Sequence, residues 1–246
     1  RVFPSTPADE WPVFPACPQE LTPVKAVLFA AIRDAMPSAS RDMTRRVLHS
    51  VLLCRDSVVA TDARHLVRLD CAAPLEDPVI VPVTKPLASG LLKDDGAMAV
   101  TGKDGVLLVH FESGAWRYMV KSVEGCYPNY RQVIPDGDRL VMKVRFTDAD
   151  VESLTKALPA FEKGDDLDGV ALYAGAKGVR FLTTKPGGTA MLETQAACEG
   201  PQEHSVVVFD RSFLLRAFEL GLNELRFGVG HMGMVPTGSR GTMVYM

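Results

Sequence analysis

The sequence predicts an α+β fold made of four βαβββ units, with two units in each of two domains. Three observations predict it. A short apolar strand leads into a helix at a constant interval, each helix is followed by three strand-like segments, and turns that contain glycine, aspartate or lysine separate those segments. The 246 residues are enough for two domains of roughly 120 residues each. We therefore expect antiparallel sheets of about eight strands per domain, with two helices on one side.

A repeat of about 63 residues defines the units. Thr84, Thr147 and Asp210 each stand between an apolar strand and a helix, where a side-chain oxygen can accept from a free N–H of the first turn. One step further back, Thr22 takes the same place, and Pro23 follows at the first helical position. Apolar residues recur at helical spacing after each predicted cap: Val24, Val27, Leu28, Ala31, Ile32 and Ala35; Leu87, Leu91 and Leu92; Val151, Leu154 and Leu158; and Phe213, Leu214, Ala217 and Phe218.

Each helix is followed by three predicted strands, and the last three helices are also preceded by one. The preceding strands cover residues 79–83, 141–146 and 206–209. Apolar alternation and hairpin turns such as Gly102–Gly105 and Gly175–Gly178 place the following strands. These are expected at residues 47–53, 57–61 and 65–69; 97–100, 106–109 and 116–123; 170–173, 179–182 and 189–195; and 224–229, 233–236 and 241–246.

Composition argues against several classes of protein. No apolar run reaches the ~18 residues of a membrane span and the first residues do not form a secretory signal, so we expect a cytoplasmic protein without a membrane partner. The net charge of −3 disfavours a protein that simply coats DNA, but it allows one with a basic face. Five cysteines without a C-x-x-C pair predict reduced thiols and no structural metal site.

Catalytic motifs are weak in this sequence. The segment Gly228–Gly233 fits G-x-G-x-x-G, but it lies between predicted strands and opens no helix, so it does not indicate a dinucleotide site. The acidic pairs Asp94-Asp95 and Asp165-Asp166 fall in predicted turns. The sequence contains no P-loop, G-x-S-x-G or H-E-x-x-H pattern. We therefore predict a protein without catalytic activity, cofactor or metal.

Four segments carry motifs in a fixed order along the chain. Arg46–Leu53 is similar to R-x-x-L-N-G-V-L-L, and Val58–Leu66, with the sequence V-V-A-T-D-A-R-H-L, is similar to A-T-D-G-H-R-L. Gly125–Pro135 is similar to G-x-F-P-D-Y-x-x-V-x-P, and Thr242–Met246 looks like a closing strand. Together they resemble the second and third domains of bacterial DNA sliding clamps, the beta subunit of DNA polymerase III. The resemblance implies a DNA-clamp fold, in which antiparallel sheets lie outside and helices line a ring.

The resemblance also implies a division of the chain. Residues 1–16 would be the exit segment of a missing or reduced first domain, residues 17–135 the family's second domain and residues 136–246 its third. Two alternatives stay open for the ring. If a first domain is missing, the intact protein is expected to be a dimer. If the chain is a true two-domain clamp, a ring of six domains requires a trimer.

The function implied by the resemblance is that of a polymerase processivity factor. Such a clamp encircles duplex DNA and slides because it contacts phosphates without reading bases. It docks the DNA polymerase, the clamp loader and repair proteins through a short linear motif. Basic residues on or near the helices are the candidates for facing DNA, although a solvated surface charge is the alternative for each. They are Lys25, Arg33, Arg45, Arg46, Lys85, Lys93, Lys156, Arg211 and Arg216.

A peptide-binding pocket between the second and third domains is also implied. Carried over by position, its wall is Leu48, Thr61, Ala63, Arg64, His65, Leu66, Pro128, Gln132, Val133, Val244 and Met246. The apolar members have plain core as their alternative, but convergence from four distant segments favours a cleft. Ala63 in place of glycine, the Arg64-His65 order and Gln132 depart from the family's pattern, so the partner motif stays open.

Two other functions are alternatives. One is a plasmid- or phage-type clamp homologue that binds clamp partners without tethering a polymerase. The other is a small-molecule enzyme that uses the cleft near His65. The sequence supplies no nucleophile or base beside this histidine, which argues against the enzyme.

Overall fold

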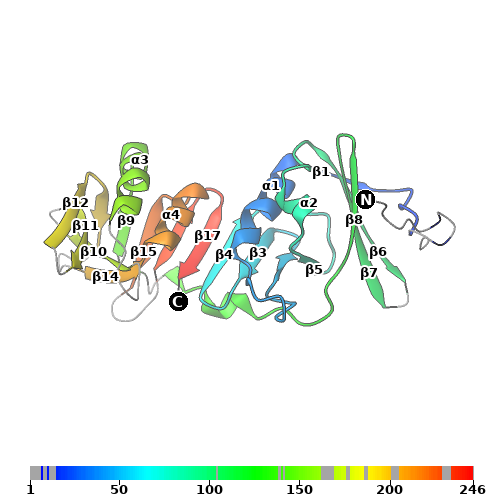
Figure 1. Ribbon diagram of the computed structural model, residues 1–246, viewed down its shortest axis with the longest axis horizontal. Helices are drawn as coiled ribbons and strands as arrows, with labels where there is room; N and C mark the ends of the chain where they lie inside the picture. The colour runs from blue at the N-terminus through cyan, green and yellow to red at the C-terminus, as the bar shows by residue number, and fades with distance from the viewer. Residues whose placement is uncertain are drawn as a thin grey trace, which may run out of the picture.

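A computed structural model gives the fold (Figure 1) and describes residues 7, 10, 15–103, 105–137, 140, 142–161, 169–175, 178–185, 188–200, 205–228 and 234–245. Among these residues, no helix is long and apolar enough to cross a membrane. Several sequence predictions lie outside the described residues: Met246, Asp165-Asp166 and residues 229–233 of the glycine motif.

The chain contains the four predicted βαβββ units. The first comprises β1 (Thr22–Val24), α1 (Ala26–Ala35), β2 (Ser50–Leu53), β3 (Ser57–Thr61) and β4 (His65–Asp70). The second comprises β5 (Val79–Pro82), α2 (Lys85–Ala88), β6 (Gly96–Lys103), β7 (Val106–Ser113) and β8 (Trp116–Lys121). The third comprises β9 (Met142–Arg145), α3 (Asp148–Ala157), β10 (Gly169–Gly175), β11 (Gly178–Lys185) and β12 (Gly188–Thr194), followed by an additional short strand, β13 (Ala197–Glu199). The fourth comprises β14 (Ser205–Asp210), α4 (Arg211–Glu219), β15 (Glu224–Phe227), β16 (Val235–Gly238) and β17 (Gly241–Tyr245), and the predicted α+β fold class is confirmed.

Each unit gives its first strand to the sheet of its neighbour. The first and second units are called the first half of the molecule below, and the third and fourth units the second half. In the first half, β1 pairs with β6 and β5 pairs with β2. In the second half, β9 pairs with β15 and β14 pairs with β10. All four pairings are antiparallel, so an edge that one unit leaves open is covered by the next. The exchange explains why the units occur in pairs.

One sheet runs through both halves of the molecule. Its strand order is β13-β9-β15-β16-β17-β4-β3-β2-β5, and the halves meet where β17 pairs antiparallel with β4 (Figure 1). In this pairing Val244 lies opposite Leu66, and Tyr245 lies opposite His65. The other two sheets have the orders β1-β6-β7-β8 and β12-β11-β10-β14. The β4–β17 pairing is called the junction below.

The four α-helices lie along one side of the molecule, in the order α3, α4, α1 and α2 across Figure 1. The predicted start of the first helix at Thr22 is wrong. Thr22 pairs with β6, and α1 begins only after Lys25, which is extended. The shift leaves Val27 51% exposed, whereas Leu28 and Ile32 are buried. Pro23 lies in β1, an edge strand, where a missing N–H is tolerated.

Helix α2 is shorter than the predicted helix of about ten residues. It ends at Ala88, because Gly90 adopts a φ of +76° and leaves the helical conformation. Leu87 and Leu92 are buried as predicted, but Leu91 is 36% exposed. The backbone requirement of one glycine therefore shortens a segment whose apolar spacing suggested a longer helix.

The predicted caps differ in how they act. Thr147 forms a capping box with Asp150: the amide of Asp150 donates to Thr147 Oγ1 at 3.1 Å, and the amide of Thr147 donates to Asp150 Oδ2 at 3.0 Å. Asp210 accepts from the amide of Ser212 at 2.8 Å. Thr84 precedes α2 but makes no capping bond, and its hydroxyl accepts from the Tyr118 hydroxyl at 3.0 Å instead.

Apolar packing crosses the junction on both faces of the sheet. Val67 and Met243 belong to a cluster centred on α1 that also receives Leu220 and Leu222 from the second half. Leu66 and Val244 belong to a cluster on the opposite face, together with other residues of β2, β3, β5, η3 (Tyr130–Val133) and β16. Successive residues of a strand point to opposite faces, so one register serves both clusters.

Gly241→Ala is expected to weaken the junction. Gly241 has a φ of +148°, and a Cβ there would lie 2.1 Å from the carbonyl oxygen of Arg68 on β4. Because backbone atoms cannot move away cheaply, we expect the free energy of unfolding, measured by urea denaturation, to fall by more than about 2 kcal/mol. Gly105→Ala is the matched control, since Gly105 also has a positive φ, +77°, but nothing lies within 4 Å of its added Cβ. Equal losses in the two variants would contradict a close approach of β17 to β4.

Candidate functional site

Side chains of the predicted pocket build the β3–β4 turn beside the junction. Thr61 Oγ1 donates to the carbonyl of His65 at 2.6 Å and accepts from the amide of Ala63 at 3.1 Å. Asp62 Oδ1 accepts from the amides of Arg64 and His65 at 2.8 and 3.0 Å. These bonds hold Ala63 at a φ of +75°, and among the described residues no other non-glycine residue has a positive φ. The motif that the turn resembles has glycine at this position because a Cβ is disfavoured there.

An aromatic stack connects the turn to the second half of the chain. The ring of Phe213, on α4, lies 4.8 Å from that of His65 and 4.5 Å from that of Tyr245. Burial lowers the pKa of His65 and outweighs the opposing effect of Asp62. Asp62 Oδ1 lies 2.9 Å from Nδ1 of His65 without making a directed hydrogen bond. At neutral pH His65 therefore acts as an uncharged aromatic wall of the site.

Asp34, near the end of α1, makes a polar contact across the junction. Its Oδ2 accepts from Arg240 Nη2 at 2.6 Å, and Arg240 precedes β17. Its carbonyl accepts from Arg216, on α4, and its Oδ1 accepts from Nε of Arg33 at 3.3 Å. Arg33 and Arg216, both predicted to face DNA, are thus bound to Asp34. Arg216 fastens the two halves together.

The predicted pocket residues divide into buried and exposed groups. Leu66 and Val244 are 1% and 2% exposed and form part of the apolar cluster under the junction, and Thr61 is also buried. Leu48 is half-buried, whereas Ala63, Arg64, Pro128, Gln132 and Val133 are exposed. The register brings Thr61, Leu66 and Val244 side by side. Tyr127 and Tyr130 are buried in the same cluster, and they place the exposed residues Pro128, Gln132 and Val133 beside it.

A cavity of about 580 Å³ opens next to this turn. Of the predicted pocket residues, Arg64 and His65 line it. Sequence reasoning missed most of the rest of its wall: the loop around Arg41 and Asp42, and Phe213 on α4. The sequence predicted Phe213 only as one of the apolar positions of the last helix, and the loop around Arg41 carries no periodic signal. The junction brings α4 to the turn, whereas the loop of Arg41 belongs to the same half of the chain as the turn.

The environments of two predicted DNA-facing helix residues differ sharply. Arg211 is 6% exposed, and its guanidinium donates to the carbonyls of Leu158 and Phe161. Buried arginines of this kind satisfy backbone carbonyls that would otherwise lack a partner. Arg211 therefore does not belong to an exposed basic face. Lys85, by contrast, is exposed on α2.

The other exposed cations differ in their partners. Lys25 pairs with Asp95 at 2.8 Å, and Lys156 pairs with Glu152 at 2.6 Å one turn away on α3. Both pairs are largely exposed, so each contributes little to stability. Four predicted cations are exposed and form no ion pair with any residue that the structure describes: Arg45, Arg46, Lys85 and Lys93.

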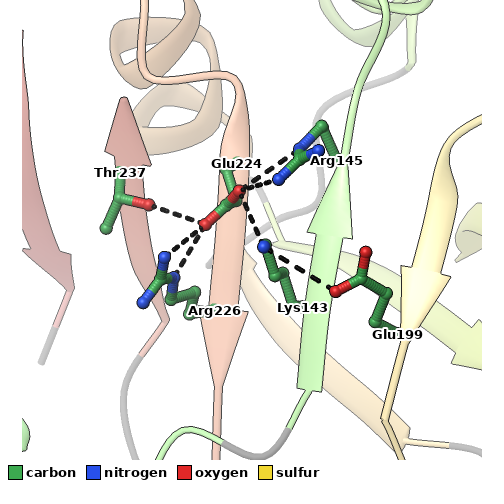
Figure 2. A network of polar contacts seen from close by, with 6 residues as sticks. All are labelled: Lys143, Arg145, Glu199, Glu224, Arg226 and Thr237. Carbon is green, nitrogen blue, oxygen red and sulfur yellow. Dashed lines mark hydrogen bonds and ion pairs between the residues drawn. The ribbon is translucent and has the colours of Figure 1, made fainter. Parts of the chain in front are cut away.

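Figure 2 shows a charged cluster on the sheet that sequence reasoning also missed. The carboxylate of Glu224 lies 3.4 Å from Lys143, 3.1 Å from Arg145 and 2.7 Å from Arg226. Burial acts to raise the pKa of Glu224, but bonds from Arg226 and Arg145 outweigh it and lower that pKa. The cluster joins β9, β15 and, through Glu199, β13. Its cations already have partners, so it strengthens the sheet instead of offering a ligand site.

Ala63→Gly is expected to raise the free energy of unfolding by about 0.5–1 kcal/mol. The glycine removes a Cβ that is strained at a φ of +75°, although the more flexible unfolded chain offsets part of this gain. Urea denaturation of the two proteins measures the difference. Ala63→Val should act in the opposite direction, because a β-branched side chain is worse in this conformation. A loss of stability with glycine would show that the turn carries no such strain.

Solved structures of other proteins share this fold. No family model matches the sequence, and no curated protein matches it. Among solved structures, the chain is similar to the DNA polymerase sliding clamp from Bacillus subtilis, with a TM-score of 0.79 and 18% identity over 97% of this chain and 67% of that one. It is similar to the C. crescentus beta sliding clamp, with a TM-score of 0.80 and 20% identity over 99% and 70%.

A third similar structure is the Helicobacter pylori beta clamp bound to a DNA ligase peptide, with a TM-score of 0.75 and 19% identity over 98% of this chain and 69% of that one. The chain thus spans 67–70% of the length of these three clamps. At such identities the likeness concerns the fold. It agrees with the resemblance that the four sequence motifs carry: this chain has the fold of the bacterial DNA sliding clamps.

Proposed function

We propose that this chain is a DNA sliding clamp, a non-catalytic protein that encloses duplex DNA in a ring and docks partner proteins through short peptides. The observation that carries the proposal is the sheet that continues through both halves with the α-helices on one side (Figure 1). Repeating this arrangement around a circle puts the sheets outside and the helices toward the hole. Enclosure combined with phosphate contacts is sufficient for sliding.

The junction also supplies a template for closing the ring. β4 is the last strand of the first unit and pairs with β17, the last strand of the fourth. β8 and β12 take the same place in the second and third units, as the third strand after the helix, and each is terminal in its sheet. Each carries an exposed apolar residue, Met191 on β12 and Trp116 on β8. Pairing of β12 with a β8-type strand would repeat the junction between chains, giving a trimer of two-domain chains, or a dimer if a further domain covers β8.

The exposed cations support a DNA-facing helix side. Lys85 is the first residue of α2, Lys93 follows that helix, and Arg46 follows α1 in the chain. Because they have no carboxylate partner among the described residues, they can bind phosphates without first breaking an ion pair. Lys25 and Lys156 would exchange weak surface pairs for phosphates.

Peptide docking at the junction is supported by the position and chemistry of the site. The segment 128–133, which is exposed except for Tyr130, meets the β3–β4 turn and the end of β17 there around a shared apolar cluster. The H. pylori clamp, which shares the fold, has been solved with a DNA ligase peptide bound. A polymerase, a clamp loader or a repair protein would dock here through a linear motif.

A second candidate has one observation in its favour. The solved clamps are only 16–21% identical to this chain, and the Ala63-Arg64-His65 turn departs from the motif it resembles. A divergent clamp homologue, of plasmid or phage type, would bind clamp partners without acting as the replicative processivity factor.

Retention on circular DNA tests the proposed function. The full gene product is loaded with its cell's clamp loader onto a nicked circular plasmid, and the mixture is passed over a sizing column in high salt. We expect co-elution with the circle and loss after the plasmid is linearised, because only enclosure survives screening of the phosphate contacts. Light scattering of the free protein gives the number of chains in the ring.

Equal loss from circular and linear plasmid would contradict the clamp proposal. Retention on circles without any increase in the length of DNA synthesised per binding event would favour the divergent homologue. The linear plasmid serves as the control for ordinary DNA affinity, since it carries the same phosphates as the circle.

A further inference from the structure

The cavity of about 580 Å³ next to the β3–β4 turn lies between three separate parts of the chain. One wall is the loop that contains Arg41, Asp42 and Arg45, and a second is the turn that contains Asp62 and Arg64. Helix α4 forms the third wall. The cavity therefore combines both halves of the molecule and exists only when the junction is formed.

Three guanidinium groups in these walls are available to a ligand. Arg41, Arg45 and Arg64 are exposed, and none of their side chains makes a hydrogen bond or ion pair to another residue within the described ranges. Arg216, which also lines the cavity, is different because it is bound to Glu219 and to the carbonyl of Asp34. A cavity with three free guanidinium groups favours an anionic group that can accept several hydrogen bonds.

The carboxylates of the cavity are, in contrast, already satisfied. Asp42 Oδ1 accepts from the hydroxyl and amide of Thr44 at 2.7 and 2.9 Å, and these bonds lower the pKa of Asp42. Asp62 Oδ1 accepts from the amides of Arg64 and His65. Both acids therefore hold their own loops. Arg45 lies close enough to Asp42 for its charge to help lower the pKa of that carboxyl, but within the described residues neither acid forms an ion pair with a cavity arginine.

One side of the cavity is apolar. Phe213 lines it and is held by contacts with His65 and Tyr245. A ligand that fits must place an aliphatic or aromatic part against this ring while it presents an acid to the arginines.

We propose that this cavity binds an acidic residue of the docked partner peptide, so that the clamp site of this chain selects peptides with glutamate or aspartate beside their apolar anchors. The inference rests on the proposed peptide docking at the junction and names the chemistry of the partner. Arg45, from the loop after α1, and Arg64, from the β3–β4 turn, bind the acid, and Phe213 receives the neighbouring side chain.

A polypeptide fits this cavity better than nucleic acid does. A phosphate backbone carries a negative charge on every unit and would meet the carboxyl groups of Asp42 and Asp62 as well as the arginines. A peptide offers isolated carboxylates for the arginines, N–H groups for the remaining lone pairs of the acids and an apolar side chain for Phe213. A cavity that contains arginines, carboxyl groups and an apolar wall therefore favours a ligand with an acid, N–H donors and an apolar side chain.

Fluorescence anisotropy with two matched peptides tests the proposal. Both carry a Leu-Phe pair as the apolar anchor; glutamates precede the pair in one peptide, and glutamines replace them in the other. We expect the full protein to bind the glutamate peptide about tenfold more tightly, and Arg64→Gln and Arg45→Gln each to remove most of that difference. Arg55→Gln is the control, because Arg55 is an exposed arginine on the β2–β3 turn, outside the cavity, and its side chain has no partner among the residues that the structure describes. It should change neither affinity.

Equal binding of the two peptides would overturn the acid preference and leave peptide docking standing. Binding of neither peptide would overturn both the inference and the docking part of the proposed function, while retention on circular DNA reports on the ring separately. Fluorescein-labelled duplex and single-stranded DNA complete the comparison. If Arg64→Gln and Arg45→Gln weaken DNA binding strongly and change neither peptide affinity, the cavity belongs to nucleic acid and the proposal is wrong.

Discussion

The backbone pairing of β4 with β17 is the constraint on which the rest of the structure depends. Without it, both strands would present an open edge of unpaired N–H and C=O groups in the middle of the molecule. The pairing requires a glycine at position 241, because no side chain fits between the two backbones there. Cores on both faces of the sheet share its register, so a slip of one residue would exchange Val67 with Leu66 and disrupt both.

The same register assembles the candidate site. Placing Tyr245 opposite His65 lets Phe213 of α4 pack against both rings, and this fixes α4 over the β3–β4 turn. Asp34 then reaches Arg240 and Arg216 from the other half. The cavity with its free arginines is a consequence of these contacts. Site and junction therefore form one structural unit, and a substitution that weakens the junction should also weaken ligand binding.

The sequence was sufficient to predict the order of the elements and the family that the fold resembles. The 63-residue interval, the caps at Thr147 and Asp210 and the alternation along the strands are local signals, and local hydrogen bonds and burial enforce them. The predicted helix start at Thr22 was wrong because an edge pairing with β6, a tertiary contact, outweighed the tendency of this residue to cap a helix. The predicted length of the second helix was too great because Gly90 leaves the helical conformation.

The candidate site was less predictable for a related reason. The β3–β4 turn could be located because its motif is contiguous, and Arg64 and His65 do line the cavity. Arg41 and Phe213 lie outside that motif in the chain. Packing within the first half brings the loop of Arg41 to the turn, and the junction brings Phe213. The charge of Arg211 suggested a surface role, but three-dimensional packing buries it against the carbonyls of Leu158 and Phe161. No pattern in one sequence distinguishes such an arginine from an exposed one.

Hydrogen exchange at the junction tests the central claim most directly. Mass spectrometry of the native protein would compare peptides that cover β4 and β17 with those that cover β2 and β3, inside the first half. If the junction is an integral part of the fold, amides of β4 and β17 should be protected to the same opening free energy as those of β2 and β3. Exchange of the β17 peptide at a much lower free energy, with β2 and β3 still protected, would show that the halves separate readily. That result would contradict an account in which the junction holds both the fold and the site.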